Sequence, residues 1–192
     1  QTCDREVVTE YTSTTSRAVL QHDLNADSNV YASFSEGFKA GGYATYECTE
    51  PYDPEEVTSF ELGFKGSLGE NTSLNASLFR YDYTDFQVLQ VVGIQTVTRN
   101  AGDATVNGLE LEALSNINDS LSINYGLTLL DATYGEFLNT NGIQPQLGEQ
   151  QLEGNYLTNA PKVSINLGLN YTSLMSSGSS LTYRANAAYK SR

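Results

Sequence analysis

Few side chains in this sequence could carry out chemistry. His22 is the sole histidine, so a Ser-His-Asp triad would have to include it. It lies in an alternating run beside Gln21 and Asp23, which favours a surface or rim position. Asp82 and Asp85 are close enough in sequence to act as paired carboxylates, but a loop or a polar wall accounts for them more simply. We therefore predict no catalytic residue and no enzyme.

Metal, phosphate and cofactor sites have little support. Gly37, Gly41 and Gly42 lie close together, but no GxxxxGK[ST] motif and no helix pattern accompanies them. Cys3 and Cys48 form no CxxC pair, so we predict neither a metal site nor a cofactor. Two cysteines are compatible with one disulfide in an oxidising compartment.

The composition excludes some partners and favours β structure. The chain has 192 residues, of which 10 are basic and 23 acidic, for a formal net charge of −13. Nucleic acid is therefore not an expected partner, because phosphate binding needs clustered Lys and Arg. No run approaches the ~20 apolar residues of a membrane helix. The sequence contains 16 Gly, 13 Tyr and 7 Phe, with abundant Asn, Ser and Thr, a composition that favours strands and turns.

Apolar and polar residues alternate with a period of two, which predicts β-strands. From Leu121 to Leu129 every odd position is apolar or aromatic and every even position is Ser, Asn, Gly or Thr; Val163–Tyr171 repeats this pattern. Glu110 and Glu112 share one strand face, where they could line a polar interior. We expect about eight strands, near residues 16–24, 29–39, 57–68, 72–91, 104–115, 120–136, 161–173 and 180–190.

One of these runs has an irregular pattern. Its apolar positions change phase, from Leu74, Ala76 and Leu78 to Phe79, Tyr81 and Tyr83. A β-bulge would produce such a change, and so would a strand that leaves the membrane at this point.

Short and long connections alternate along the chain. Tight turns are expected at 25–28, 69–72, 116–119 and 176–179, and long polar loops at about 40–56, 92–104 and 138–158. Membrane barrels have this asymmetry, with short periplasmic turns and long external loops. Tyrosines also gather near the ends of the runs, where a ring with a polar tip suits a membrane–water boundary. We therefore predict an all-β protein, an antiparallel transmembrane β-barrel, although a half-buried soluble sheet has the same alternation.

Five segments in order resemble the TonB-dependent outer-membrane receptors. They are Val30–Tyr43, Tyr52–Lys65, Phe79–Gln87, Asn100–Glu112 and Asn159–Lys162. The resemblance implies a barrel of about 22 strands around an N-terminal plug that contacts TonB. Residues 1–192 are expected to be an incomplete wall of about eight strands from the C-terminal half of that barrel, without the plug or the closing strand. The chain also opens without a signal-peptide pattern, as expected for a mature form or an internal fragment.

The resemblance implies a function in the bacterial outer membrane. Receptors of this family use TonB to import a scarce ligand, most often a ferric siderophore. The implied partners are outer-membrane lipid, the TonB complex acting through the plug segment of the parent protein, and the siderophore. Two alternatives remain open, a passive porin-like channel and a secreted β-sandwich adhesin or binding module.

The same resemblance suggests which residues lie on external loops. The candidate ligand contacts are Tyr43, Tyr46, Tyr52 and Tyr134. Cys3 and Cys48 would lie on neighbouring external segments, where we expect that they could form a disulfide.

Overall fold

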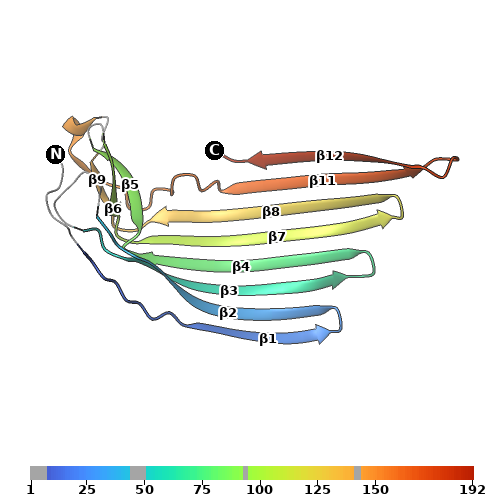
Figure 1. The fold of residues 1–192 in the computed structure, drawn as a ribbon, viewed down its shortest axis with the longest axis horizontal. Helices are drawn as coiled ribbons and strands as arrows, with labels where there is room; N and C mark the ends of the chain where they lie inside the picture. The colour runs from blue at the N-terminus through green and yellow to red at the C-terminus, as the bar shows by residue number, and fades with distance from the viewer. Residues whose placement is uncertain (1–7, 44–50, 93–94, 141–143) are drawn as a thin grey trace.

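The computed structural model describes residues 8–43, 51–92, 95–140 and 144–192. Its main element is one antiparallel sheet of eight strands, with β1 and β12 at the two edges (Figure 1). In spatial order the strands are β1 (Arg17–Asn25), β2 (Ser28–Lys39), β3 (Glu55–Leu68), β4 (Thr72–Thr84), β7 (Ala104–Asn118), β8 (Leu121–Tyr134), β11 (Val163–Leu174) and β12 (Ser180–Lys190). The prediction of about eight antiparallel strands is confirmed.

The register gives the sheet two chemically different faces. One row that crosses all eight strands consists of His22, Val30, Phe64, Ala76, Leu111, Leu127, Ile165 and Tyr189. The adjacent row consists of Gln21, Tyr31, Gly63, Ser77, Glu110, Thr128, Ser164 and Lys190. Because successive residues of a strand point to opposite sides, the first row defines an apolar face and the second a polar face.

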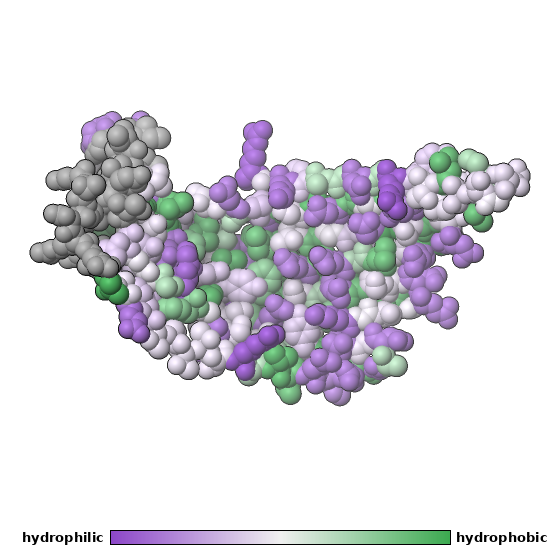
Figure 2. All heavy atoms as spheres, in the orientation of Figure 1, coloured by the Kyte–Doolittle hydropathy of each residue, from purple (hydrophilic) through white to green (hydrophobic). Residues whose placement is uncertain are grey.

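The apolar face is not covered by other described elements. Leu62 and Leu78 on this face are 61% and 55% exposed, and Leu167 is 49% exposed. Figure 2 views the sheet from one side, where hydrophilic side chains are spread along the strands and hydrophobic ones show between them. A sheet of this kind has the chemistry of a barrel wall, with one apolar and one polar surface.

The prediction of one long strand over residues 72–91 is wrong. Strand β4 ends at Thr84, and Asp85 has a φ of 53°, in the left-handed region that turns the chain out of the sheet. The pairings of β4 with both neighbours contain no register shift, so the chain leaves the sheet without a bulge. The change of phase arises because the polar face carries aromatic side chains near this end. Phe79 is the first of them, and it lies against Gly108 of the neighbouring strand.

The long connections lie together at one end of the sheet, and tight turns join the strands at the other end (Figure 1). The long connections contain the hairpin of β5 (Gln87–Val92) and β6 (Gln95–Asn100), the pair of β9 (Leu138–Thr140) and β10 (Glu149–Gln151), and the 3-10 turn η1 (Pro145–Leu147). No helix in the described part of the chain is long and apolar enough to cross a membrane.

Candidate functional site at the loop-bearing end of the sheet

The loops pack into a small apolar core above the end of the sheet. Its most buried members are Val97, Ala101, Ala104, Ala132 and Phe137, each at most 8% exposed. They come from β6 and the residue after it, from the start of β7 and the end of β8, and from the loop after β8. Burial of apolar surface thus holds the connections in place against the sheet.

Aromatic rings extend this core from the sheet into the loops. The ring centroid of Phe86 lies 5.2 Å from that of Tyr83 and 6.4 Å from that of Tyr134. Tyr134 lies in turn 5.3 Å from Phe137. The backbone of Tyr134 also bonds to the next loop segment, because its N–H donates to the carbonyl of Asn155 over 2.9 Å. Tyr134 therefore has a packing role at this end of the sheet.

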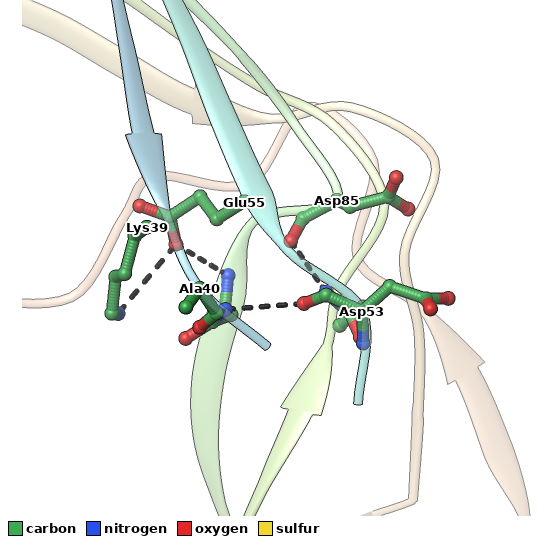
Figure 3. Close-up of polar contacts among 7 residues, drawn as sticks. Lys39, Ala40, Asp53, Glu55 and Asp85 are labelled. Carbon is green, nitrogen blue, oxygen red and sulfur yellow. Dashed lines mark hydrogen bonds and ion pairs between the residues drawn. The ribbon is translucent and has the colours of Figure 1, made fainter. Parts of the chain in front are cut away.

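Two side-chain amides join the base of the hairpin to the connection between β2 and β3. We call the side chains of Gln87 and Asn100 the amide clasp. Figure 3 labels the residues they bind, Ala40, Asp53 and Asp85. The Nε2 of Gln87 donates to the carbonyls of Ala40 and Asp53, each over 3.1 Å. The backbone N–H of Gln87 donates to Oε2 of Glu55 over 2.7 Å, and Lys39 Nζ lies 3.8 Å from the same oxygen.

Asn100 makes the second half of the amide clasp. Its Nδ2 donates to the carbonyls of Asp53 over 3.0 Å and of Asp85 over 2.7 Å, while its Oδ1 accepts from the N–H of Asp53 over 2.7 Å. The bond to Asp85 satisfies a carbonyl at the point where the chain turns out of the sheet. Sequence reasoning missed this role, although Asn100 opens one of the five segments that carry the family resemblance.

The predicted ligand-contact tyrosines lie in different surroundings. Tyr52 forms an isolated antiparallel bridge with Gly42, with N–H to carbonyl distances of 2.8 and 3.1 Å. Tyr11 donates its hydroxyl to the carbonyl of Tyr52 over 3.4 Å. Tyr43 directly follows this bridge and is half-buried. The fourth candidate, Tyr46, lies outside the described residues, and so do Cys3 and Cys48.

The polar face forms an open hollow below the loops. Tyr31 donates its hydroxyl to Glu61, and Lys65 Nζ lies 5.1 Å from the centre of the Tyr31 ring. Tyr31 and Lys65 line a hollow of about 610 Å³ together with Arg17 and Tyr81. The expected polar side of the wall is thus open and carries charges of both signs.

The groups considered for chemistry are held in structural contacts. Asp82 accepts from Arg80 over 2.7 Å and from the hydroxyl of Thr105 over 3.1 Å, so its carboxylate is already engaged. Asp85 occupies the turn out of the sheet, and His22 lies on the apolar face of the edge strand β1. Within the described ranges, no three His, Cys, Asp or Glu side chains gather in a way that could hold a metal ion.

Residues 4–192 match the family described as TonB dependent receptor-like, beta-barrel. The chain belongs to this family. The resemblance found in the five sequence segments is thereby confirmed. The family consists of transporters of the Gram-negative outer membrane and not of enzymes, and this places the chain in that membrane.

Two curated relatives of this TonB-dependent receptor chain are named as a siderophore receptor and a ferric-pyoverdine receptor. One, from Acinetobacter baumannii, is named "Probable TonB-dependent siderophore receptor PiuA"; it is 33% identical over 145 residues, which are 73% of this chain and 18% of that protein. Another is the "Ferric-pyoverdine BN7/BN8 receptor" of Pseudomonas putida, 29% identical over 129 residues, or 65% of this chain and 16% of the relative. The chain thus spans less than a fifth of the length of these relatives.

Solved structures share the fold. The ferric yersiniabactin uptake receptor FyuA from Yersinia pestis aligns with a TM-score of 0.70 and 22% identity, over 90% of this chain and 25% of that one. The eight-stranded sheet therefore corresponds to about a quarter of a receptor chain of this type.

Proposed function

We propose that this chain is part of an outer-membrane receptor that imports a ferric siderophore with energy supplied through TonB. The observation that carries the proposal is the family match over residues 4–192, together with one relative named as a siderophore receptor and another named as a ferric-pyoverdine receptor. The apolar face would contact outer-membrane lipid and the polar face would line the lumen. In the parent protein, TonB would act through the plug segment that the family resemblance implies.

The loop-bearing end is the natural place for a ligand to enter. The amide clasp and the aromatic contacts fix the loops above the polar face, so a ligand would meet preorganised side chains. We propose that Tyr43, Tyr46 and Tyr52 contact the ligand from the connection between β2 and β3. Tyr134 would contribute from the end of β8, where its ring packs between Phe86 and Phe137. Tyrosine suits this task because it combines a large apolar ring with a hydroxyl group.

A disulfide between Cys3 and Cys48 would add a covalent restraint to the same connection. Mass spectrometry of peptides prepared without a reductant would find the two residues cross-linked. Recovery of both thiols in free form from the oxidised protein would contradict this proposal.

The adhesin alternative has a structural difficulty. A β-sandwich buries the apolar faces of two sheets against each other. Leu62 and Leu78 remain more than half exposed here, at 61% and 55%, and no other described strand packs on them. A lipid-facing wall accounts for such exposure without a second sheet.

Uptake of radiolabelled iron tests the proposal. Iron-starved cells that make no siderophore of their own would be given a panel of ferric siderophores, with the receptor present or deleted and with TonB present or deleted. The proposal expects uptake of at least one complex that requires both the receptor and TonB. Uptake that requires the receptor but continues without TonB would favour the passive channel instead.

A further inference from the structure

The apolar face of the sheet changes character within three consecutive rows of residues near the loop-bearing end. The rows cross β2, β3, β4, β7 and β8, each of which has a neighbouring strand on both sides. The first, which we call the apolar row, consists of Ala32, Leu62, Leu78, Leu109 and Leu129. The second, the mixed row, consists of Phe34, Phe60, Arg80, Asn107 and Asp131. The third, the hydrophilic row, consists of Glu36, Thr58, Asp82, Thr105 and Thr133.

The charged side chains of the last two rows are bonded to each other and remain open to solvent. Arg80 donates to both carboxylate oxygens of Asp82, over 2.7 and 2.8 Å. The hydroxyl of Thr105 donates to the same carboxylate over 3.1 Å. The side chain of Arg80 is nevertheless 53% exposed. Such a group suits contact with water or with polar headgroups, because hydrocarbon would leave its charge without solvation.

The opposite face of the same strands changes in the reverse sense. At the level of Glu110 and Thr128, which pair with each other, this face is polar. Closer to the loops it carries Tyr81, Val106 and Ala132, which also lie in one row. Ala132 is only 3% exposed, because it belongs to the small apolar core that the loops form. At this end the sheet therefore resembles a half-buried sheet of a water-soluble protein, with its apolar side in a core and its polar side in solvent.

We propose that the mixed row lies in the headgroup layer of the outer leaflet and that the hydrophilic row stands in water outside the bilayer. Membrane barrels have an apolar outer band with aromatic residues at both of its limits. Phe34 and Phe60 supply such residues in the mixed row, and their ring centroids are 5.2 Å apart. The placement rests on the part of the proposed function in which the apolar face contacts lipid, and it adds the level at which that contact ends.

The height of the apolar surface agrees with this placement. On β8 the apolar face carries apolar or aromatic residues at every position from Leu121 to Leu129. At ~3.3 Å per residue and a strand tilt of ~40°, this stretch rises by about 20 Å, close to the ~25 Å of the apolar band in membrane barrels. Tyr171 pairs with Leu121 at the other limit, and its ring stacks on Tyr183 with the centroids 6.3 Å apart.

The same boundary explains the change of phase in β4. Up to Leu78 the apolar side chains of this strand are on the face that contacts lipid. From Phe79 onwards they are on the opposite face, where Tyr83 packs against Phe86 of the loops with the ring centroids 5.2 Å apart. A strand that leaves the bilayer at this point needs its apolar side chains in the loop core and its polar ones in water.

Spin labels on the apolar face of β8 test the level of the boundary. The parent receptor, with Cys3 and Cys48 replaced by serine, would carry one label at a time in phospholipid vesicles. The labelled positions are Leu127, Leu129, Asp131 and Thr133. The measurement is the ratio of collisions with a water-soluble nickel chelate to collisions with oxygen. Because the polar chelate is excluded from hydrocarbon, this ratio should rise by roughly fivefold or more from Leu129 to Thr133.

A label at Asp119 is the matched control, because this residue lies in the exposed tight turn at the opposite end of the sheet and gives the value for water. The ratio at Thr133 should approach that value, and the ratio at Asp131 should lie between those of Leu129 and Thr133. Ratios at Asp131 and Thr133 as low as at Leu129 would place the boundary beyond the hydrophilic row and overturn the proposal. Suppressed collisions with both reagents at Leu127 and Leu129 would show that protein covers this surface, and would overturn it as well.

A second measurement needs no substitution. Asp131 is exposed, so in the unaltered receptor in vesicles a water-soluble carbodiimide and an amine should modify its carboxylate. Mass spectrometry of the digested protein would compare this rate with that of a membrane-soluble carbodiimide. Faster modification of Asp131 by the membrane-soluble reagent would place the mixed row in hydrocarbon and overturn the proposal.

The placement and the uptake function fail in distinguishable ways. A receptor in which the ratio rises between Leu129 and Thr133, but which imports no ferric siderophore, would retain the placement and lose the uptake function. A receptor that imports a ferric siderophore through TonB, but in which Thr133 is as deep as Leu129, would retain the function and lose the placement.

Discussion

Replacing Asn100 with alanine removes three hydrogen bonds, two donated to the carbonyls of Asp53 and Asp85 and one accepted from the N–H of Asp53. Each intramolecular bond contributes a net ~0.5–1.5 kcal/mol, and because water can replace part of this loss, we expect local destabilisation of about 1–3 kcal/mol. The loss should be confined to the base of the β5–β6 hairpin and to the connection that Asp53 belongs to, since the amide clasp joins only these segments.

Hydrogen exchange of backbone amides measures this local opening. The N–H groups of Tyr52, Phe86 and Ala101 are bonded within 2.8 Å to carbonyls at the loop-bearing end, so they report on the clasp. At a tenfold change for each 1.4 kcal/mol, their exchange in Asn100→Ala should accelerate by roughly fivefold to a hundredfold. Exchange at Glu61, in the middle of β3, should not change.

Asn118 provides the matched control, because it has the same side chain at the opposite end of the sheet. Its Oδ1 accepts from the N–H groups of Ser120 and Leu121 over 2.9 and 3.0 Å. Asn118→Ala should accelerate exchange at that turn and leave Tyr52 and Phe86 protected. Unchanged protection at Tyr52 and Phe86 in Asn100→Ala, or equal opening of the entire sheet, would refute the role assigned to the clasp.

Two further substitutions test the packing and the faces of the sheet, both by urea unfolding of the protein in lipid vesicles. Gly108→Ala places a Cβ inside the contact distance of the Phe79 ring and should lower the free energy of unfolding by about 1–3 kcal/mol. Gly126→Ala should be close to neutral, because its Cβ would meet only atoms 3.8 Å away or farther. Equal effects of the two substitutions would contradict the packing of Phe79 on Gly108. Leu167→Arg on the apolar face should lower the free energy of unfolding by about 2–4 kcal/mol, and Asn166→Arg on the polar face should lower it much less. A larger loss for Asn166→Arg than for Leu167→Arg would contradict the assignment of the faces.

Most of the sheet could be predicted because the two-residue period follows from the covalent geometry of an extended chain. The apolar and polar residues keep that period from Leu121 to Leu129 in β8 and from Val163 to Tyr171 in β11, and the strands expected there agree with the structure within a few residues. The tight turns were also predictable, because each contains residues that favour turns.

The path of the chain after β4 could not be predicted in the same way. The left-handed conformation of Asp85 depends on a carbonyl contact from Asn100, which is 15 residues later in the chain. In the sequence, Phe79 and Tyr81 look like a shift of the apolar positions. In the structure they occupy the polar face, because Gly108 leaves room for the Phe79 ring and the centroids of the two rings stack 4.8 Å apart. Contacts between distant segments decide both features, so a local pattern does not reveal them.

The orientation of the two faces in the membrane is the central claim, and spin labels along β8 test it most directly. Single cysteines would be introduced into a background in which Cys3 and Cys48 are replaced by serine. The labelled positions are Ile123, Asn124, Tyr125, Gly126, Leu127 and Thr128, which alternate between the two faces. We predict that collision with oxygen, which concentrates in the bilayer, is highest at the odd positions. Accessibility to oxygen that does not alternate, or that is highest at the even positions, would contradict a lipid-facing apolar surface.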